Sequence, residues 1–280
     1  MPPTTFATLP LPPGIRSRFV PQVNGLTMHL LEAGFETQHR PCVLLLHGFP
    51  ELAYSWRKVM LPLATAGFHI IAPDQRGYGR TTGWDSTYDG DLEAFRVLNT
   101  REANANMHAC PQGVHAFLRA YYHMKSADWQ PNTPFPLHAW RADELAKMPT
   151  YYIMALGQGM AETVAPEMPS AADIAACTWF PDEELAVYST EYSRTGFQGG
   201  LQWYRCATGG KDSLELQLFS GRTLDVPSMF MAGKSDWGVY QRPGNFERMQ
   251  NHACTAMRGC HLLDGAGHWV QQEQPERVSQ

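Results

Sequence analysis

The feature that most constrains the fold is an unbroken apolar run at 42–46 (CVLLL), which ends at the turn 47–50 (HGFP). Apolar and polar residues do not alternate along it, which is typical of a strand covered on both faces in a parallel sheet. A helical pattern follows, which Ser55 could cap and Gly67 could close. A second apolar run at 69–73 completes the order strand, helix, strand, which predicts a right-handed βαβ unit.

The rest of the chain extends this pattern. Strand-like segments 18–23 and 26–30 flank Asn24-Gly25, the preferred pair for a tight type I′ hairpin turn. Strand character returns at 226–233 and 259–263, with a helix expected around 245–251 between them. The middle is rich in Ala, Met, Tyr and Trp at helical spacing. We therefore expect an α/β fold in which 1–98 and 221–280 form the core and 99–220 form a helical lid.

Composition narrows the class of protein. Apolar residues make up 44% of the 280 residues, and 22 Lys and Arg stand against 27 Asp and Glu. This balance attracts neither nucleic acid nor an anionic membrane, and the longest aliphatic run, 43–46, is too short to span a bilayer. The N-terminus lacks the pattern of a secretory signal. Six scattered cysteines have neither metal-ligand nor CxxC spacing, so we expect reduced thiols in a cytoplasmic protein.

Five segments in order carry a family resemblance: 47–57 (HGFPELAYSWR), 74–80 (DQRGYGR), 188–205, 233–238 (GKSDWG) and 265–269 (GAGHW). Together they resemble the epoxide hydrolase branch of the α/β-hydrolase fold, over nearly the whole chain. The resemblance implies a mostly parallel sheet with helices on both faces and an inserted lid. It also implies hydrolysis of a small-molecule epoxide to a vicinal diol, without a metal or organic cofactor.

In that family an aspartate attacks the epoxide and forms an alkyl-enzyme ester, and a histidine oriented by a carboxylate activates the water that hydrolyses it. His268 follows a strand, on a loop where α/β folds keep their chemistry. Asp236 lies just beyond the strand that ends at Gly233, so it can serve as the orienting acid. Its alternative roles are a turn cap or, because Asp236-Trp237-Gly238 mimics the family's nucleophile segment, the nucleophile itself. Only one strand and His268 follow Asp236, which favours the acid.

Other residues complete the expected site. The Phe49 N–H is a candidate oxyanion donor in the exposed turn, where His47 has a structural role. Tyr188 and Tyr192 share one face of a helix that Pro181 opens and Gly196 closes. They could simply pack the lid core, but the resemblance favours Tyr188 as the residue that polarises the epoxide oxygen. Together with Phe49, the residues expected to line the pocket are Trp56, Tyr192 and Trp237.

The nucleophile of the family is not recognisable. Residues 91–98 begin a helix and 99–104 already resemble lid, so no aliphatic strand with an aspartate turn lies between them, and roughly 30 residues of a βα unit are missing. There is no GxSxG motif, Gln158 in the glycine turn at 157–159 is no nucleophile, and the acids at 89, 91 and 93 fit a helix N-terminus. We therefore expect an incomplete sheet with an exposed face, a shortened last helix and low stability.

Three functions fit this sequence. The first is an epoxide hydrolase-type enzyme, whose catalytic competence depends on the missing nucleophile. The second is a truncated, non-catalytic isoform that keeps the lid pocket and binds a ligand or partner. The third is a dehalogenase of the same fold, which the lid tyrosine segment disfavours.

Overall fold

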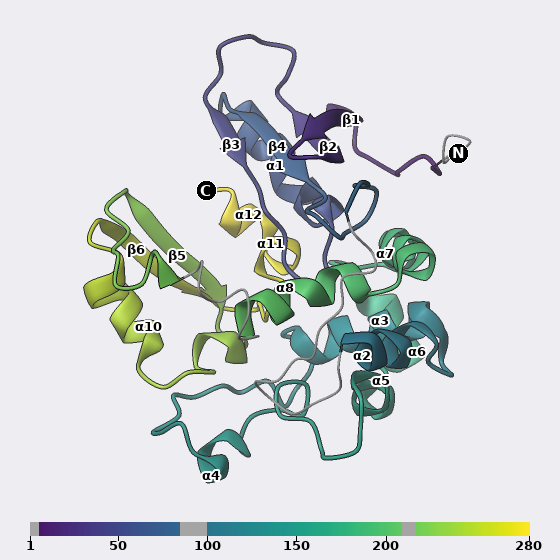
Figure 1. Ribbon diagram of the computed structural model, residues 1–280, viewed down its shortest axis with the longest axis vertical. Coiled ribbons are helices and arrows are strands. Elements are labelled where there is room, and N and C mark those ends of the chain that lie inside the picture. Colours follow the sequence, from purple (N-terminus) through teal and green to yellow (C-terminus); the bar gives the residue numbers. More distant parts are fainter. Residues whose placement is uncertain (1–5, 85–99, 209–216) are drawn as a thin grey trace.

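The computed structural model describes residues 6–84, 100–208 and 217–280 (Figure 1). Short single-turn helices are labelled η. The elements in chain order are β1 (Ile15–Val23), β2 (Leu26–Ala33), β3 (Cys42–Leu44), η1 (Ala53–Trp56), α1 (Arg57–Thr65), β4 (His69–Pro73), α2 (Thr100–His108), α3 (Gly113–Lys125), α4 (Ala142–Leu145), α5 (Met160–Val164), η3 (Ala165–Glu167), α6 (Ala171–Ala176), α7 (Asp182–Thr195), α8 (Gln198–Thr208), β5 (Ser228–Gly233), η4 (Trp237–Val239), α10 (Asn245–Arg248), η5 (Met249–Ala253), β6 (Met257–Leu263), α11 (Val270–Glu273) and α12 (Pro275–Val278).

The first sheet has the strand order β1-β2-β4-β3. β1 and β2 form the predicted hairpin, and its turn residues Asn24 and Gly25 both have positive φ, as a type I′ turn requires. β3 and β4 are parallel and α1 joins them, which confirms the βαβ unit. The expected cap by Ser55 is wrong: this residue lies inside η1, and its hydroxyl bonds to Tyr188 instead of to the start of α1.

The second sheet contains β5 and β6, which are parallel. Among the strand pairings of the described residues, two are parallel and two antiparallel, so the α/β architecture is mixed. Figure 1 shows α11 and α12 between the two sheets, and α11 contacts both α1 and β5. The C-terminal helices thereby link the two sheets.

The helices α2, α3, α5, α6 and α7 gather on one side of the molecule (Figure 1). α3 packs along α7, and the large side chains buried there include Phe117, Tyr122 and Tyr188. α7 follows Pro181 and ends at Gly196, as predicted. The three-part division at residues 98 and 220 stays a prediction, and the expected helix at 91–98 lies outside the described residues.

The expectation that the 42–46 strand is covered on both faces is wrong. β3 is the outermost strand of its sheet, so Leu44 and Leu46 keep 58% and 53% of their surface exposed. A mainly apolar groove of about 660 Å³ opens beside them, lined in part by Met28 and Trp203. On β5, Met229 is likewise 60% exposed. The predicted exposed sheet face is therefore present, at strands that have no further neighbour among the described residues.

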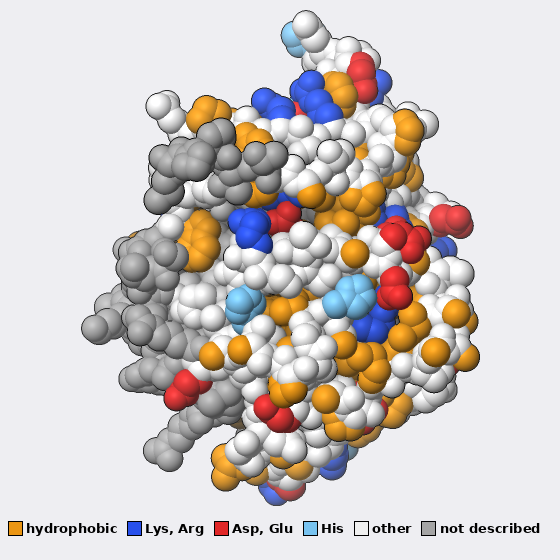
Figure 2. Space-filling model, turned by 90° about the vertical axis from the view of Figure 1, so that its right-hand side faces the viewer, with side chains coloured by type: hydrophobic (Ala, Val, Ile, Leu, Met, Phe, Trp, Pro, Cys, Tyr) orange, Lys and Arg blue, Asp and Glu red, His pale blue; other side chains and the backbone are white. Residues whose placement is uncertain are grey.

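Other described features bear on function. No helix of the described ranges is long and apolar enough to cross a membrane, and these ranges contain no cluster of His, Cys, Asp and Glu suited to a metal. The five cysteines with described side chains are free thiols. Figure 2 shows one face of the molecule, on which acidic and basic side chains are interspersed without a large area of one charge.

Candidate active site

The site centres on a hydrogen-bonded pair, His268 and Asp236. The imidazole Nδ1 lies 3.1 Å from Oδ1 and 3.2 Å from Oδ2 of the carboxylate. The Asp236 side chain is largely buried, whereas the His268 side chain keeps 32% of its surface accessible. A neutral histidine that donates from Nδ1 leaves Nε2 as an acceptor, so this arrangement can take a proton from a water molecule.

The fold brings these two residues together through the pairing of β5 with β6. Their last residues, Gly233 and Leu263, are opposite each other, so the loops that follow begin at the same edge of the sheet. The Ser235 N–H donates to the Ala266 carbonyl across these loops. A Cβ at Gly233 would lie 2.1 Å from that same carbonyl oxygen, so only glycine allows this approach.

The charges around Asp236 favour its ionised form. Burial by itself would raise the pKa of this carboxyl, but the facing His268 imidazole, the Gly238 N–H and the Lys125 ammonium lower it below its ordinary value. The Gly238 N–H donates to Oδ1 at 2.7 Å, so Asp236 also caps η4, the role weighed against the catalytic one in the sequence. The same carboxylate therefore caps η4 and contacts His268.

The backbone around His268 is held by hydrogen bonds on three successive residues. The His268 N–H donates to the Lys125 carbonyl at 2.9 Å. On either side, the N–H groups of Gly267 and Trp269 donate to the Glu273 carboxyl at 2.9 and 3.0 Å. Trp269 is buried and stacks on Tyr122, and this packing holds the loop against α3.

Lys125 places a buried ammonium among aromatic rings next to the pair. Its Nζ lies 4.9 Å from the ring centre of Tyr152 and 5.4 Å from that of Tyr151, with Tyr121 and Trp269 also within 6 Å. Its hydrogen bond to the Tyr121 hydroxyl is long, at 3.5 Å. The rings therefore stabilise this charge mainly through their faces.

The turn at 47–50 has the expected local structure. His47 is buried, contacts the Gly48 carbonyl through Nδ1 and accepts from the Gln75 N–H, so it ties the turn to the loop after β4. Burial lowers its pKa, which suits a neutral structural histidine. The Phe49 ring packs against Tyr204, and within the described ranges the Phe49 N–H has no hydrogen-bond acceptor.

The two lid tyrosines singled out from the sequence do not face the pair. Tyr188 is completely buried, and its hydroxyl is engaged by Ser55 at 2.8 Å and by Gln272 at 3.2 Å. Tyr192 is also buried, and its hydroxyl donates to the Glu51 carbonyl. Both side chains pack in the core, which is the alternative considered from the sequence, because the face of α7 that carries them points inward.

Trp56 and Trp237, the two tryptophans expected to line the pocket, lie at different places. Trp237 is buried directly after Asp236, against Phe135. Trp56 is half-buried at the end of η1 and packs against the core. The indole N–H of each is buried without a hydrogen-bond partner in the described structure.

The tyrosines that do lie near the pair were missed as catalytic candidates. The ring centres of Tyr152 and Tyr151 lie 4.9 and 5.4 Å from the Lys125 ammonium beside the pair. Burial raises the pKa of the Tyr152 hydroxyl, against the opposing charge of Lys125. The Tyr151 hydroxyl donates to Asn132, and the Tyr204 ring packs edge-on against Phe49. Adjacent tyrosines in a turn carry no periodicity, so the sequence signal for them was weak.

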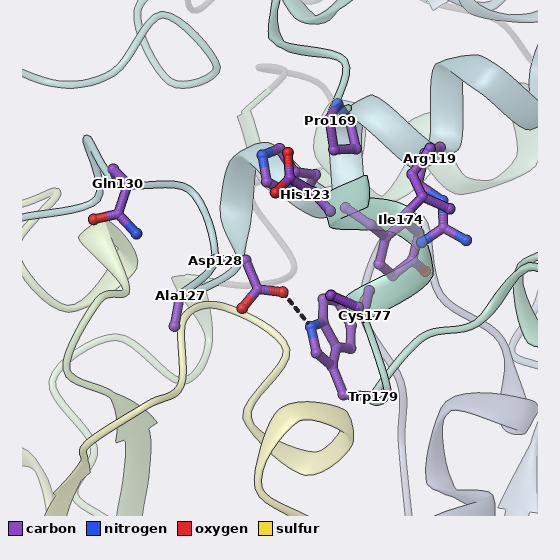
Figure 3. Close-up of a pocket in the computed structure, with 12 residues that line it drawn as sticks. Arg119, His123, Ala127, Asp128, Gln130, Pro169, Ile174, Cys177 and Trp179 are labelled. Carbon is purple, nitrogen blue, oxygen red and sulfur yellow. Dashed lines mark hydrogen bonds between the residues drawn. The ribbon is translucent and has the colours of Figure 1, made fainter. Parts of the chain in front are cut away.

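A separate cavity of about 270 Å³ opens between α3 and α6 (Figure 3). Figure 3 shows Asp128 and Trp179 pointing toward each other, with a 2.7 Å hydrogen bond between them. Arg119 and His123 line the same cavity from α3. None of the predicted site residues contributes to it.

A histidine–aspartate pair at the ends of adjacent parallel strands, with a βαβ unit before it, defines an α/β-hydrolase. Residues 41–151 match the family model for the alpha/beta hydrolase fold. Epoxide hydrolase A of Mycobacterium tuberculosis is 31% identical over 323 aligned positions that cover 91% of this chain and 92% of the relative. An epoxide hydrolase of Caballeronia sordidicola is 28% identical, with 92% and 89% covered. The chain belongs to the epoxide hydrolase family.

Solved structures share this fold. An epoxide hydrolase from an endophytic Streptomyces superposes with a TM-score of 0.72 at 22% identity, covering 96% of this chain and 94% of that one. Potato epoxide hydrolase I gives a TM-score of 0.60 at 26% identity, with 95% and 97% covered. The alignment with the mycobacterial relative has 323 positions against 280 residues here, so at least 43 residues of the relative have no counterpart in this chain.

Proposed function

We propose that this chain hydrolyses a small-molecule epoxide and that His268 is the general base that activates water. The observation that carries the proposal is the 3.1 Å contact between His268 Nδ1 and Asp236, with the imidazole still accessible. The lowered pKa of Asp236 keeps a negative charge beside the imidazolium that forms when water loses its proton. No metal or organic cofactor is needed for this chemistry.

The epoxide oxygen needs a hydrogen-bond donor as the ring opens. Tyr152 fits this role better than Tyr188, because its ring lies 4.9 Å from the Lys125 ammonium beside the pair, whereas the Tyr188 hydroxyl is engaged by Ser55 and Gln272. The free Phe49 N–H is the corresponding candidate for stabilising an oxyanion during ester hydrolysis.

The attacking carboxylate lies outside this arrangement. Among the described residues, Asp236 is the one carboxylate bonded to the His268 ring. The acids Asp89, Asp91 and Glu93 lie outside the described ranges. The described residues therefore supply the water-activating pair without assigning the attacking carboxylate.

The test is diol formation from a chromogenic epoxide by the purified chain. His268→Asn and Asp236→Asn should each abolish it, while His252→Asn, an exposed histidine of η5, should leave it unchanged. In the His268→Asn variant, an ester that cannot be hydrolysed should appear by mass spectrometry as an adduct with the mass of the epoxide. Turnover that survives His268→Asn, or a wild type with neither diol nor adduct, would refute the enzymatic function.

Ligand binding without catalysis is the second candidate function. The observation that favours it is that at least 43 residues of the mycobacterial relative have no counterpart in this chain. Titration with a urea or amide that mimics the epoxide should then show saturable binding without turnover. Absence of saturable binding would eliminate this function.

We further propose a cytoplasmic location, because the five described cysteines are unpaired thiols, as expected in a reducing compartment. Fractionation of cells that express the tagged chain tests this location. Recovery in an oxidising compartment with paired cysteines would contradict it.

A further inference from the structure

The Glu273 carboxyl joins three segments of the chain around the active-site histidine. Its Oε2 accepts from the N–H of Ala127 at 2.8 Å and from that of Gly267 at 2.9 Å, and its Oε1 accepts from the N–H of Trp269 at 3.0 Å. Ala127 follows α3, Gly267 and Trp269 flank the histidine, and Glu273 ends α11. One carboxylate therefore ties the histidine loop to two helices.

The loop is also packed tightly against the segment after α3. A Cβ on Gly267 would lie 2.5 Å from the Lys125 carbonyl oxygen and 2.8 Å from the Ala127 nitrogen. The His268 N–H donates to that same Lys125 oxygen. With the two bonds to Glu273, the N–H groups of residues 267–269 are all hydrogen-bonded. These bonds set the direction in which the His268 side chain leaves the backbone.

We propose that Glu273 is the positioning residue of His268, which it holds at bonding distance from Asp236 by accepting the N–H groups on either side. This inference rests on the proposed function of His268 as the water-activating base. Glu273 acts through the backbone and does not contact the imidazole. Among the described residues, Glu273 is the one carboxylate that accepts backbone N–H groups of residues 267–269, whereas Asp236 accepts from the His268 side chain.

Glu273→Gln tests the inference with almost no change in shape. The amide NH₂ is a donor and cannot accept from a backbone N–H, so at least one of the three bonds is lost. Glu276→Gln, an exposed position of α12 three residues away, is the matched control. The readout is the proton on His268 Nδ1 in NMR spectra, which is slow to exchange while it is bonded to Asp236; His268→Asn assigns the signal.

We expect the Nδ1–H signal in the wild type and in Glu276→Gln, and its loss or broadening in Glu273→Gln at a temperature at which that variant is still folded. An unchanged signal in a folded Glu273→Gln variant overturns the inference. This readout needs no turnover, so a chain without any diol formation would refute the proposed enzyme while leaving the positioning role supported.

A pH titration of the wild type keeps the test decisive if the variant unfolds. Burial raises the pKa of Glu273 to about 7, with a further contribution from the nearby Asp128 charge, whereas the pKa of Asp236 is lowered. Asp236, with the Lys125 ammonium near it, therefore stays ionised over the pH range in which Glu273 takes up its proton. A proton added to the His268 ring goes to Nε2 and leaves the Nδ1–H in place. The amide signals of Gly267 and Trp269 and the His268 Nδ1–H should change along the same curve as the Glu273 carboxyl carbon. An Nδ1–H signal that persists unchanged after this carboxyl is protonated overturns the inference.

Discussion

The backbone N–H of His268 and the carbonyl oxygen of Lys125 are joined by a 2.9 Å hydrogen bond. Lys125 is the last residue of α3, so the end of this helix directly supports the loop that carries His268. The ammonium of the same residue contributes to the electrostatics of Asp236. Backbone and side chain of Lys125 therefore act on the two members of the pair separately.

Lys125→Met separates these two contributions. The backbone hydrogen bond remains, but the positive charge is lost, so the pKa of Asp236 should rise. The pKa of Tyr204, which burial raises to about 12 against the opposing charge of Lys125, should rise further. NMR titration of the Asp236 carboxyl carbon checks the first expectation, with the half-exposed Lys147→Met as control. An unchanged Asp236 titration would contradict it.

Glu273 should make stability depend on pH. Its folded-state pKa of about 7 lies above the ordinary value of 4.5, so the native state binds this proton more tightly than the unfolded chain does. Its contribution is fully present below pH 4.5 and is lost as the pH rises through 7. Relative to Glu273→Gln, the wild type should lose about 3 kcal/mol of unfolding free energy between pH 4.5 and pH 8. Urea unfolding at both pH values measures this difference, and equal changes in the two proteins would rule it out.

Asp74 directly follows β4, and its substitution should lower the stability of the first sheet most. Its buried carboxylate accepts from His29 Nδ1 at 2.7 Å and from the N–H groups of Ala53 and Arg80 at 2.9 Å each. Asp74→Ala leaves these donors unpaired and should cost about 3–5 kcal/mol of unfolding free energy. The exposed Asp264→Ala should cost less than about 1 kcal/mol in the same denaturation experiment. Similar losses in both variants would show that the Asp74 contacts contribute little.

Two tyrosine variants should separate packing from catalysis. Tyr188→Phe removes a hydroxyl bonded to Ser55 and Gln272, so it should cost about 1 kcal/mol of stability and leave epoxide turnover unchanged. Tyr152→Phe should leave stability nearly unchanged and reduce turnover by about 100-fold. Thermal unfolding and diol formation are measured for both. The reverse pattern would restore Tyr188 as the oxygen-polarising residue.

The edge of β3, beside which the described residues place no further strand, should make the chain self-associate. Leu44 and Leu46 are more than half exposed beside an apolar groove, and unpaired strand edges favour pairing with another chain. Leu44→Lys combined with Leu46→Lys should therefore shift sedimentation toward the monomer. Leu156→Lys, at a fully exposed loop position, should have no such effect. A wild-type chain that stays monomeric at high concentration would contradict this prediction.

The sequence was informative where function depends on chain order and failed where it depends on contacts between distant segments. His268 and Asp236 could be paired because each follows a strand of one parallel pair, and such ends meet at one edge. Helical spacing indicated that Tyr188 and Tyr192 share a face, but not that this face points into the core. Ser55 satisfies its hydroxyl with a residue 133 positions away instead of capping a helix. The exposure of β3 likewise depends on which strands lie beside it.

Gly233 lies at a position where no larger residue fits. Its backbone passes so close to Ala266 that one added methyl group would act as a wedge between the loops of Asp236 and His268. An alanine here would therefore push Asp236 and His268 apart without touching either side chain. The contact between them thus requires that position 233 carry no Cβ.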